Sequence, residues 1–310
     1  MKMLDIHGLD QPISRLIMGS DFFTPETYEH VAQVLDDFTG LGGNTIDTAY
    51  IYCGGKSERA IGIWLEERRN RKDIRIWTKG AHPNQEGKQV NRQAIRDQLD
   101  ESLERLRTDY VDLYALHRDD PDVEVAVILD ILNELVEEGK IQALGGSNWT
   151  WQRLQEANRY AESNGLRGFS FSSPNLSLAK AKEPYWPDCI SADAETIGWH
   201  RQTGLALLSW SSQARGFFTG RYKREECLDP DLVRVFYNDA NWERYDRASK
   251  LAASKGVETI QIALAYVLHQ PFPTGAIIGA RNRKELESCF GAARLSLTEQ
   301  EIAWLDLQPA

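Results

Sequence analysis

Short apolar segments alternate with longer amphipathic segments along nearly the whole chain. The apolar segments have the length and the Ile, Val and Leu content of buried strands, and the amphipathic segments repeat their apolar residues at helical spacing. Strands are predicted at 15–20, 44–49, 73–80, 110–117, 142–148, 168–173, 205–211 and 274–280. Helices are predicted at 24–43, 57–70, 91–107, 123–138, 150–163, 192–202, 242–254, 258–269, 283–292 and 298–305.

Eight buried strands, each followed by a helix, predict an α/β chain that forms a single (β/α)8 TIM barrel domain over residues 1–310. A long irregular loop at 212–240 follows the seventh strand, and a C-terminal helix is expected at 298–305. A doubly wound sheet is the alternative, but the regular rhythm and the lack of a Gly-rich fingerprint favour the barrel. Thr24 and Ser57 are predicted to cap two of the helices.

Composition and charge narrow the classes of partner. The 310 residues carry 36 Lys and Arg against 46 Asp and Glu, and this net charge of −10 does not suit a polyanion-binding surface. No apolar stretch has the length of a transmembrane helix, and the N-terminal residues lack the apolar core of a secretory signal. Four scattered cysteines fit a reducing compartment. We therefore expect a cytoplasmic protein that binds neither nucleic acid nor membrane.

Two short motifs resemble known functional signatures but lack the sequence context that these signatures require. His117-Arg118-Asp119 matches the catalytic loop of protein kinases, but the asparagine expected five residues after the aspartate is Glu124. The glycines at 40–43 follow a predicted helix instead of a strand, so they mark a helix end and not a dinucleotide fingerprint. The cysteines and histidines show no metal-ligand spacing, so no metal is expected.

Ionisable side chains follow three neighbouring strands of the predicted barrel. Asp47 and Tyr52 follow the second strand, Lys79 ends the third, and His117 ends the fourth. Because active sites of such barrels lie at the C-terminal ends of the strands, we expect these four side chains to converge. Each of them alone has an ordinary structural interpretation, as a loop cap, a packing aromatic or a core histidine. Together, on successive strand ends, they indicate a catalytic site.

These four groups suit the reduction of a carbonyl. Hydride attack on a carbonyl creates an oxyanion that needs a proton and fixed hydrogen-bond donors. Tyrosine is a weak acid at neutral pH, and a lysine cation beside Tyr52 would lower the pKa of its phenol. Asp47 would keep Lys79 protonated, and His117 would orient the substrate oxygen by a hydrogen bond.

Six segments resemble the aldo-keto reductase family, in the order in which the family has them. They are D-T-A-x-x-Y (47–52), W-T-K (77–79), D-L-Y-x-L-H (112–117), G-G-S-N-W (145–149), L-S-W-S-S-Q-A-R-G-F-F-T-G (208–220) and I-I-G-A-R (277–281). The resemblance covers nearly the whole chain and implies a barrel, a monomer or weak homo-oligomer, that reduces aldehydes or ketones with NADPH. It implies Tyr52 as the general acid, Lys79 and Asp47 as the groups that tune it, and His117 as the group that orients the carbonyl.

The resemblance also implies a cofactor site, for NADPH with NADH as the alternative. Ser147 and Asn148 would hold the nicotinamide carboxamide, and Trp210 stands where the family has a stacking tyrosine. The residues expected to contact the cofactor are Gly19, Ser20, Ser147, Asn148, Ser173, Trp210, Ser211, Gln213, Arg215, Gly216, Gly279, Ala280, Arg281 and Glu285.

Besides Trp210, three of these positions depart from the family pattern. Ser173 stands where a glutamine is common, and because serine is short, the contact with the carboxamide is expected to be either lost or taken over by a water or by Asn175. Gly279 replaces a lysine found in one branch. Glu285 would lie near a 2′-phosphate or hydrogen-bond the adenine, so a preference for NADPH would rest on the basic residues Arg281, Arg283 and Lys284.

Aromatic residues in the loops are the candidates for substrate contacts. The main ones are Phe22, Tyr50, Trp149 and Trp186, and Phe23 and His200 are further candidates. The segment KEPYWPD at 182–188 is either a semi-rigid lid or a packed surface loop. Aromatic walls favour aryl aldehydes or small apolar ketones as substrates.

Two other functions would use the same barrel. A regulatory or channel-subunit-like protein would bind NADPH with little turnover, whereas the intact set of four ionisable residues favours catalysis. A lyase or isomerase that forms a Schiff base on Lys79 is disfavoured, because a lysine paired with Asp47 is held protonated and is a poor nucleophile.

Overall fold

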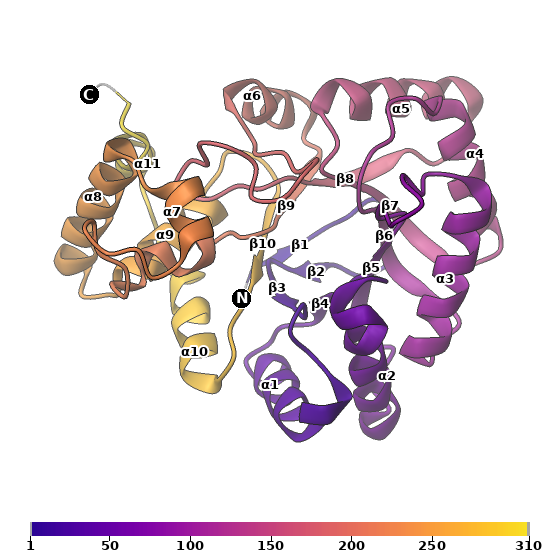
Figure 1. The fold of residues 1–310 in the computed structure, drawn as a ribbon, viewed down its shortest axis with the longest axis horizontal. Helices are drawn as coiled ribbons and strands as arrows, with labels where there is room; N and C mark the ends of the chain where they lie inside the picture. The colour runs from indigo at the N-terminus through magenta and orange to yellow at the C-terminus, as the bar shows by residue number, and fades with distance from the viewer. Residues whose placement is uncertain (1, 309–310) are drawn as a thin grey trace.

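A closed barrel of eight parallel strands forms the centre of the computed structural model, which describes residues 2–308 (Figure 1). Neighbouring strands follow the order β10-β3-β4-β5-β6-β7-β8-β9, so β10 closes the barrel against β3. The strands are β3 (Leu16–Gly19), β4 (Thr45–Asp47), β5 (Arg75–Gly80), β6 (Val111–Leu116), β7 (Ile141–Ser147), β8 (Phe169–Ser173), β9 (Ala206–Ser209) and β10 (Thr274–Ile278). The predicted (β/α)8 fold is confirmed.

Helices cover the outside of the barrel, and α7, α8, α9 and α11 gather beside β10 (Figure 1). They are α1 (Tyr28–Gly40), α2 (Lys56–Arg68), α3 (Arg92–Leu106), α4 (Val125–Glu137), α5 (Trp151–Asn164), α6 (Ala194–Thr203), α7 (Pro230–Phe236), α8 (Asp239–Lys255), α9 (Thr259–Leu268), α10 (Arg283–Ala292) and α11 (Glu299–Leu305). Short 3-10 turns are η1 (Pro25–Thr27), η2 (Tyr52–Gly55) and η3 (Ala214–Thr219). Between residues 2 and 308 no single helix has the length and apolar character needed to cross a bilayer, and α8 and α9 pass that test only as a pair bent by 101°.

Apolar side chains form two groups, one inside the barrel and one between the strands and the helices. Inside, Ile17, Trp77, Leu113 and Phe171 pack together, and the Trp77 and Phe171 rings meet edge to face with centroids 5.1 Å apart. Nearly every residue of the barrel strands is buried. Burial on both faces explains why the strands read as continuous apolar runs without alternation.

A two-stranded antiparallel hairpin before the barrel was not expected from the sequence. Its strands β1 (Met3–Leu4) and β2 (Ile13–Ser14) pair with each other, and Leu4, Ile6 and Ile13 join the apolar group inside the barrel. Because β2 directly precedes β3, the hairpin covers the N-terminal end of the barrel and leaves the C-terminal end open. Strands of two residues are too short to show a hydrophobic period.

Three local predictions are corrected. Thr24 precedes the short turn η1 and makes no capping hydrogen bond with its side chain, and α1 starts only after Thr27. Ser57 lies within the first turn of α2, whose N-cap is the left-handed Gly55, so Ser57 is not a cap. The loop predicted at 212–240 contains η3, α7 and the start of α8. Asp229 caps α7 and Pro230 takes its first position, a start signal that the sequence carried.

Candidate active site

The four ionisable residues predicted to converge lie together at the C-terminal end of the barrel. The Nζ of Lys79 forms an ion pair with the Asp47 carboxylate and donates to the carbonyl of Thr48 at 2.9 Å. The same Nζ lies 3.2 Å from the Oη of Tyr52. The rings of Tyr52 and His117 meet edge to face with centroids 5.7 Å apart. The C-terminal ends of β4 and β5 and the segments that follow β4 and β6 therefore supply one cluster.

A chain of hydroxyl groups holds the end of β4 in place. The Ser20 Oγ donates to the Asp47 carbonyl at 2.7 Å and lies 2.7 Å from the Oγ of Ser57. That oxygen lies 3.0 Å from the Oγ1 of Thr48. Ser57, expected as a helix cap, thus fixes the strand end from which Asp47 projects.

Burial opposes a charge on either member of the Asp47 and Lys79 pair. It raises the pKa of Asp47 to about 6 although the Lys79 cation works in the opposite direction. It lowers the pKa of Lys79 against the effect of the Asp47 carboxylate. Because the two side chains are 4% and 3% exposed, each depends on the other to stay charged.

Tyr52 and His117 are held in their neutral forms. Burial, followed by the Asp47 charge, raises the pKa of Tyr52 well above its ordinary value. The expected lowering of this pKa by Lys79 is therefore not met, because burial dominates and Asp47 balances the lysine charge. Burial, followed by the Lys79 and Arg118 charges, lowers the pKa of His117 well below its ordinary value. Each ring therefore keeps one proton that it can donate.

Left-handed backbone occurs in three of the segments that surround the site. Cys53, Ala81 and Asn148 have φ angles of 50°, 57° and 60°. Such angles are uncommon outside glycine and gather at functional sites, where the surrounding structure holds them. They turn the chain sharply just after Tyr52, after β5 and after β7.

A cavity with a volume of about 1290 Å³ opens at the four residues and extends to the start of α10. Nearly all of the expected cofactor contacts line it, namely Gly19, Ser20, Ser147, Asn148, Trp210, Ser211, Gln213, Arg215, Gly216, Gly279, Ala280, Arg281 and Glu285. Ser173 does not, and that prediction is corrected. It is fully buried in the wall, and its carbonyl accepts hydrogen bonds from the Asn148 N–H and the Ser147 Oγ. Asn175, the substitute weighed for it, donates its amide to the Trp210 carbonyl at 3.0 Å and so holds the wall.

Trp210 and Asn148 form one connected surface in the cavity. The indole Nε1 of Trp210 donates to the Asn148 Oδ1 at 3.2 Å, and the backbone N–H of Ile190 donates to the same oxygen at 3.2 Å. The Asn148 Nδ2 donates to the carbonyl of His117 at 3.4 Å. The ring and the amide therefore sit beside the proposed reaction centre in a fixed arrangement.

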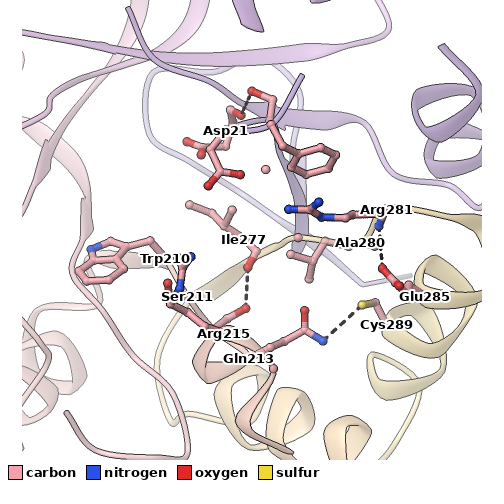
Figure 2. A pocket seen from close by; sticks show the side chains of 18 of the residues that line it. Asp21, Trp210, Ser211, Gln213, Arg215, Ile277, Ala280, Arg281, Glu285 and Cys289 are labelled. Carbon is pink, nitrogen blue, oxygen red and sulfur yellow. Dashed lines mark hydrogen bonds between the residues drawn. The ribbon is translucent and has the colours of Figure 1, made fainter. Parts of the chain in front are cut away.

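The segment around η3 is shaped to receive an anion. Ser211, Ala214, Arg215 and Gly216 all have positive φ angles, from 47° to 85°. Successive turns of this kind can present backbone N–H groups on a concave surface. Here the N–H groups of Ala214 and Gly216 donate to the carbonyls of Ser211 and Gln213 within the segment. The Arg215 guanidinium makes no ion pair within the described part of the chain, and it lies near Ser211 and Trp210 in Figure 2.

The turn between β10 and α10 uses Glu285 internally. Its Oε2 accepts from the Arg281 backbone N–H at 2.7 Å, and its Oε1 accepts from the Asn282 amide at 2.9 Å (Figure 2). The Arg281 guanidinium lies 4.7 Å from the centroid of the Phe22 ring. Glu285 therefore shapes the turn, and its neighbour Arg281 presents a cation to the cavity.

Arg283 is removed from the set of phosphate-binding candidates. It forms ion pairs with Asp37 at 2.7 Å and with Glu287 at 2.9 Å, and it does not line the cavity. Lys284 and Arg281 do line it. Consecutive residues of a helix point in different directions, so Arg283 faces other side chains while its neighbour Lys284 faces the cavity.

Two of the four main substrate candidates lie away from the cavity. Phe22 and Trp186 line it, but Tyr50 hydrogen-bonds Glu101 at 3.2 Å and faces α3. Trp149 is buried behind β7, where its ring packs against Phe169. The further candidates Phe23 and His200 are also buried, and His200 lies 2.9 Å from the Ser172 Oγ. Successive residues after a strand point in different directions, so position in a loop does not settle orientation.

Sequence reasoning missed several residues that line the cavity beside the four, among them His82, Arg118 and Cys189. The ring of His82 lies 5.0 Å from that of His117, centroid to centroid. Arg118 directly follows His117, and Cys189 comes from the loop after β8. His82 and Arg118 could have been found from the sequence, because they lie just after β5 and β6, where site residues are expected. Cys189 lies far from any strand end in the sequence and carried no such signal.

The segment at 182–188 is fastened to α7 and borders the cavity. The Lys182 N–H donates to the Val235 carbonyl at 2.9 Å, and Tyr185 is buried against Phe236. Trp186 is 43% exposed, and its ring centroid lies 5.8 Å from that of Trp210. A role as a lid stays a prediction.

A (β/α)8 barrel with a buried Asp–Lys pair, a tyrosine and a histidine at the mouth of a long cavity is the arrangement of an oxidoreductase that acts on carbonyl groups. The model of the aldo/keto reductase family matches residues 15–307, and the chain belongs to this family.

Named relatives agree with this membership, and a solved structure shares the fold. Norsolorinic acid reductase B of Aspergillus parasiticus is 30% identical over 306 residues, which are 92% of this chain and 76% of the relative. An aryl-alcohol dehydrogenase of Pestalotiopsis microspora is 29% identical over 89% of this chain and 71% of its own length. A crystal structure of a thermostable aldo-keto reductase with the inhibitor epalrestat has the same fold, with a TM-score of 0.77 over 99% of each chain and 23% identity.

Proposed function

We propose that this protein reduces aldehydes or ketones to alcohols with NADPH as the hydride donor and Tyr52 as the proton donor. The observation that carries the proposal is the 3.2 Å contact between the Tyr52 Oη and the Lys79 Nζ, backed by the buried Asp47. The relatives named as a reductase and as an alcohol dehydrogenase support a reaction between a carbonyl and an alcohol.

Each of the four side chains has one task in this reaction. A reduced nicotinamide, when bound, supplies hydride to the carbonyl carbon. Tyr52 donates its phenolic proton to the carbonyl oxygen, and His117 donates a hydrogen bond to the same oxygen. Lys79 stabilises the phenolate that remains on Tyr52, and Asp47 keeps Lys79 protonated.

The donor set along the cavity fits a nicotinamide dinucleotide. Asn148 offers an amide and Trp210 a flat ring at the reaction centre. The η3 segment offers backbone N–H groups and the unpaired cation of Arg215, which suit a pyrophosphate. Arg281 and Lys284 lie at the far end, where an adenosine phosphate would bind.

Preference for NADPH is predicted to depend on Arg281. Because a charge-assisted bond to phosphate is lost, Arg281→Ala is expected to weaken NADPH binding by about ten- to a hundredfold and to leave NADH binding nearly unchanged. Titration of tryptophan fluorescence with each cofactor measures both constants. Arg283→Ala is the matched control, since this neighbour pairs with Asp37 and Glu287 and lies off the cavity. A ratio of NADPH to NADH affinity that does not move in Arg281→Ala would contradict the assignment.

Substrates are proposed to be aryl aldehydes or small apolar ketones, because Ile51, next to Tyr52, and Trp186 form an apolar part of the cavity wall. Oxidation of NADPH by the purified protein with 4-nitrobenzaldehyde tests the proposed activity, and we expect turnover. NADPH binding without turnover across a panel of aryl and alkyl aldehydes would instead support the regulatory alternative.

A further inference from the structure

Arg118 is a buried cation in the cavity wall without an acidic partner. The residue is 6% exposed and lines the cavity beside His117. Its Nη1 donates to the His117 carbonyl at 2.8 Å, and its Nε lies 3.4 Å from the Pro187 carbonyl. Across residues 2–308 the guanidinium forms no ion pair, and its Nη2 makes no hydrogen bond to the protein. The guanidinium therefore keeps hydrogen-bond donors on Nη2 that are not used by the described part of the chain.

The two acids that follow Arg118 in the sequence are engaged by other cations. Asp119 contacts the Nε of Arg153 at 3.3 Å. Asp120 accepts from the Nζ of Lys88 at 2.7 Å. The chain therefore places two carboxylates next to the arginine and directs both away from it. Asp188, on the facing loop, is exposed and makes no ion pair within the described chain.

A buried charge without a counter-charge is costly, and arginines are rarely buried unless they are paired. The planar guanidinium matches a carboxylate in a bidentate geometry. An anion that binds in the cavity would supply the missing partner. The charge of Arg118 already acts on the reaction centre, because it contributes to the lowered pKa of His117.

The cofactor does not account for this cation. Arg118 follows β6, and the segment proposed to hold the adenosine phosphate follows β10, on the opposite side of the closed barrel. Arg215 and Arg281, the cations proposed for the pyrophosphate and the adenosine phosphate, come from the segments after β9 and β10, and their guanidinium groups lie over the rings of Tyr185 and Phe22. The anion that pairs with Arg118 therefore belongs to the substrate.

We propose that Arg118 binds a carboxylate on the substrate, so that the preferred substrates are aldehydes or ketones that also carry a carboxylate. This inference rests on the proposed carbonyl reduction and specifies its substrate class. Arg118 and His117 are consecutive residues. The carboxylate would bind at Arg118 while His117 and Tyr52 hold the carbonyl oxygen. Trp186, which precedes Pro187 in the loop that contacts Arg118, would then contact the apolar part between the two groups.

The test compares 4-carboxybenzaldehyde with its neutral methyl ester, methyl 4-formylbenzoate, and repeats the pair with the 3-carboxy isomers. Wild type is expected to show a kcat/KM for the better acid about ten- to a hundredfold above that for its ester, mainly through KM. Arg118→Met is expected to remove this preference, so that the acid and its ester have kcat/KM values within a few fold of each other. Arg118→Lys keeps the charge without the fork and should fall between the two.

Binding is measured separately from turnover. Benzoate, titrated by tryptophan fluorescence with NADPH present, should bind wild type at least tenfold more tightly than Arg118→Met, whereas neutral benzamide should not distinguish them. If wild type reduces 4-nitrobenzaldehyde but shows neither a preference for the acids nor a preference for benzoate, the inference is wrong and the proposed function stands. If wild type reduces none of the aldehydes, the proposed function fails and the inference fails with it.

Discussion

Replacing Tyr52 with phenylalanine is expected to lower kcat for aldehyde reduction by about 10²–10⁴-fold, the usual contribution of a positioned acid. The change removes one oxygen and leaves the ring that packs against His117. Affinity for NADPH should stay within a few fold of wild type, because the cofactor-facing residues Asn148, Trp210 and Arg215 are untouched.

Tyr50, a second tyrosine in the same loop, provides a matched control. Tyr50 carries the same hydroxyl two residues earlier, but it bonds Glu101 outside the cavity. Tyr50→Phe should therefore retain wild-type kcat. Both variants are measured by NADPH oxidation with 4-nitrobenzaldehyde and by fluorescence titration of NADPH. If Tyr52→Phe were as active as wild type, the proton would have to come from another group, and His117 would be the first to test.

Replacing Lys79 with methionine is expected to abolish activity and to lower the free energy of unfolding by about 3–5 kcal/mol at pH 8, since it leaves the Asp47 carboxylate buried without a counter-charge. Asp47→Asn in the same chain removes that charge, so the double variant should regain most of the lost stability but no activity. Urea unfolding of the two single variants, the double variant and wild type gives the coupling energy.

The dependence of this loss on pH has a definite sign. The folded-state pKa of Asp47 is already raised to about 6 with Lys79 present, and it would rise further without the cation. A carboxyl with a raised folded-state pKa favours folding at low pH, and this contribution is lost as the pH rises through that pKa. The destabilisation by Lys79→Met should therefore be largest at pH 8 and shrink toward pH 5. A loss independent of pH would show that packing, and not the charge of Asp47, limits stability.

The regular elements of the fold were largely readable from the sequence. The helix predicted at 91–107 is α3, because Asn91 caps it and its apolar residues repeat at helical spacing. The N-terminal hairpin escaped prediction because pairs of two-residue strands carry no period. Ser57 looked like a helix cap, but Gly55 in the left-handed region starts α2 earlier.

The four residues at the reaction centre were predictable for a topological reason. In a closed parallel barrel every strand ends at the same rim, so polar residues after successive strands must meet. No comparable rule predicts which loop residues line the part of the cavity that would hold the substrate. Tyr50 and Trp149 stand one or two residues from residues that line the cavity, and both point elsewhere.

The sequence by itself determined the barrel, the family and the four residues at the reaction centre, because strand period and position at a strand end are local properties. The tertiary structure decided which basic side chains are paired with an acidic residue and which are not. Arg283 is neutralised by Asp37, 246 positions away in the chain, while Arg281 two residues earlier faces the cavity. Asp119 turns to Arg153 and leaves Arg118 unpaired. Ion pairing depends on distances between elements that only the folded chain brings together, and these pairings decide which cations remain for ligands.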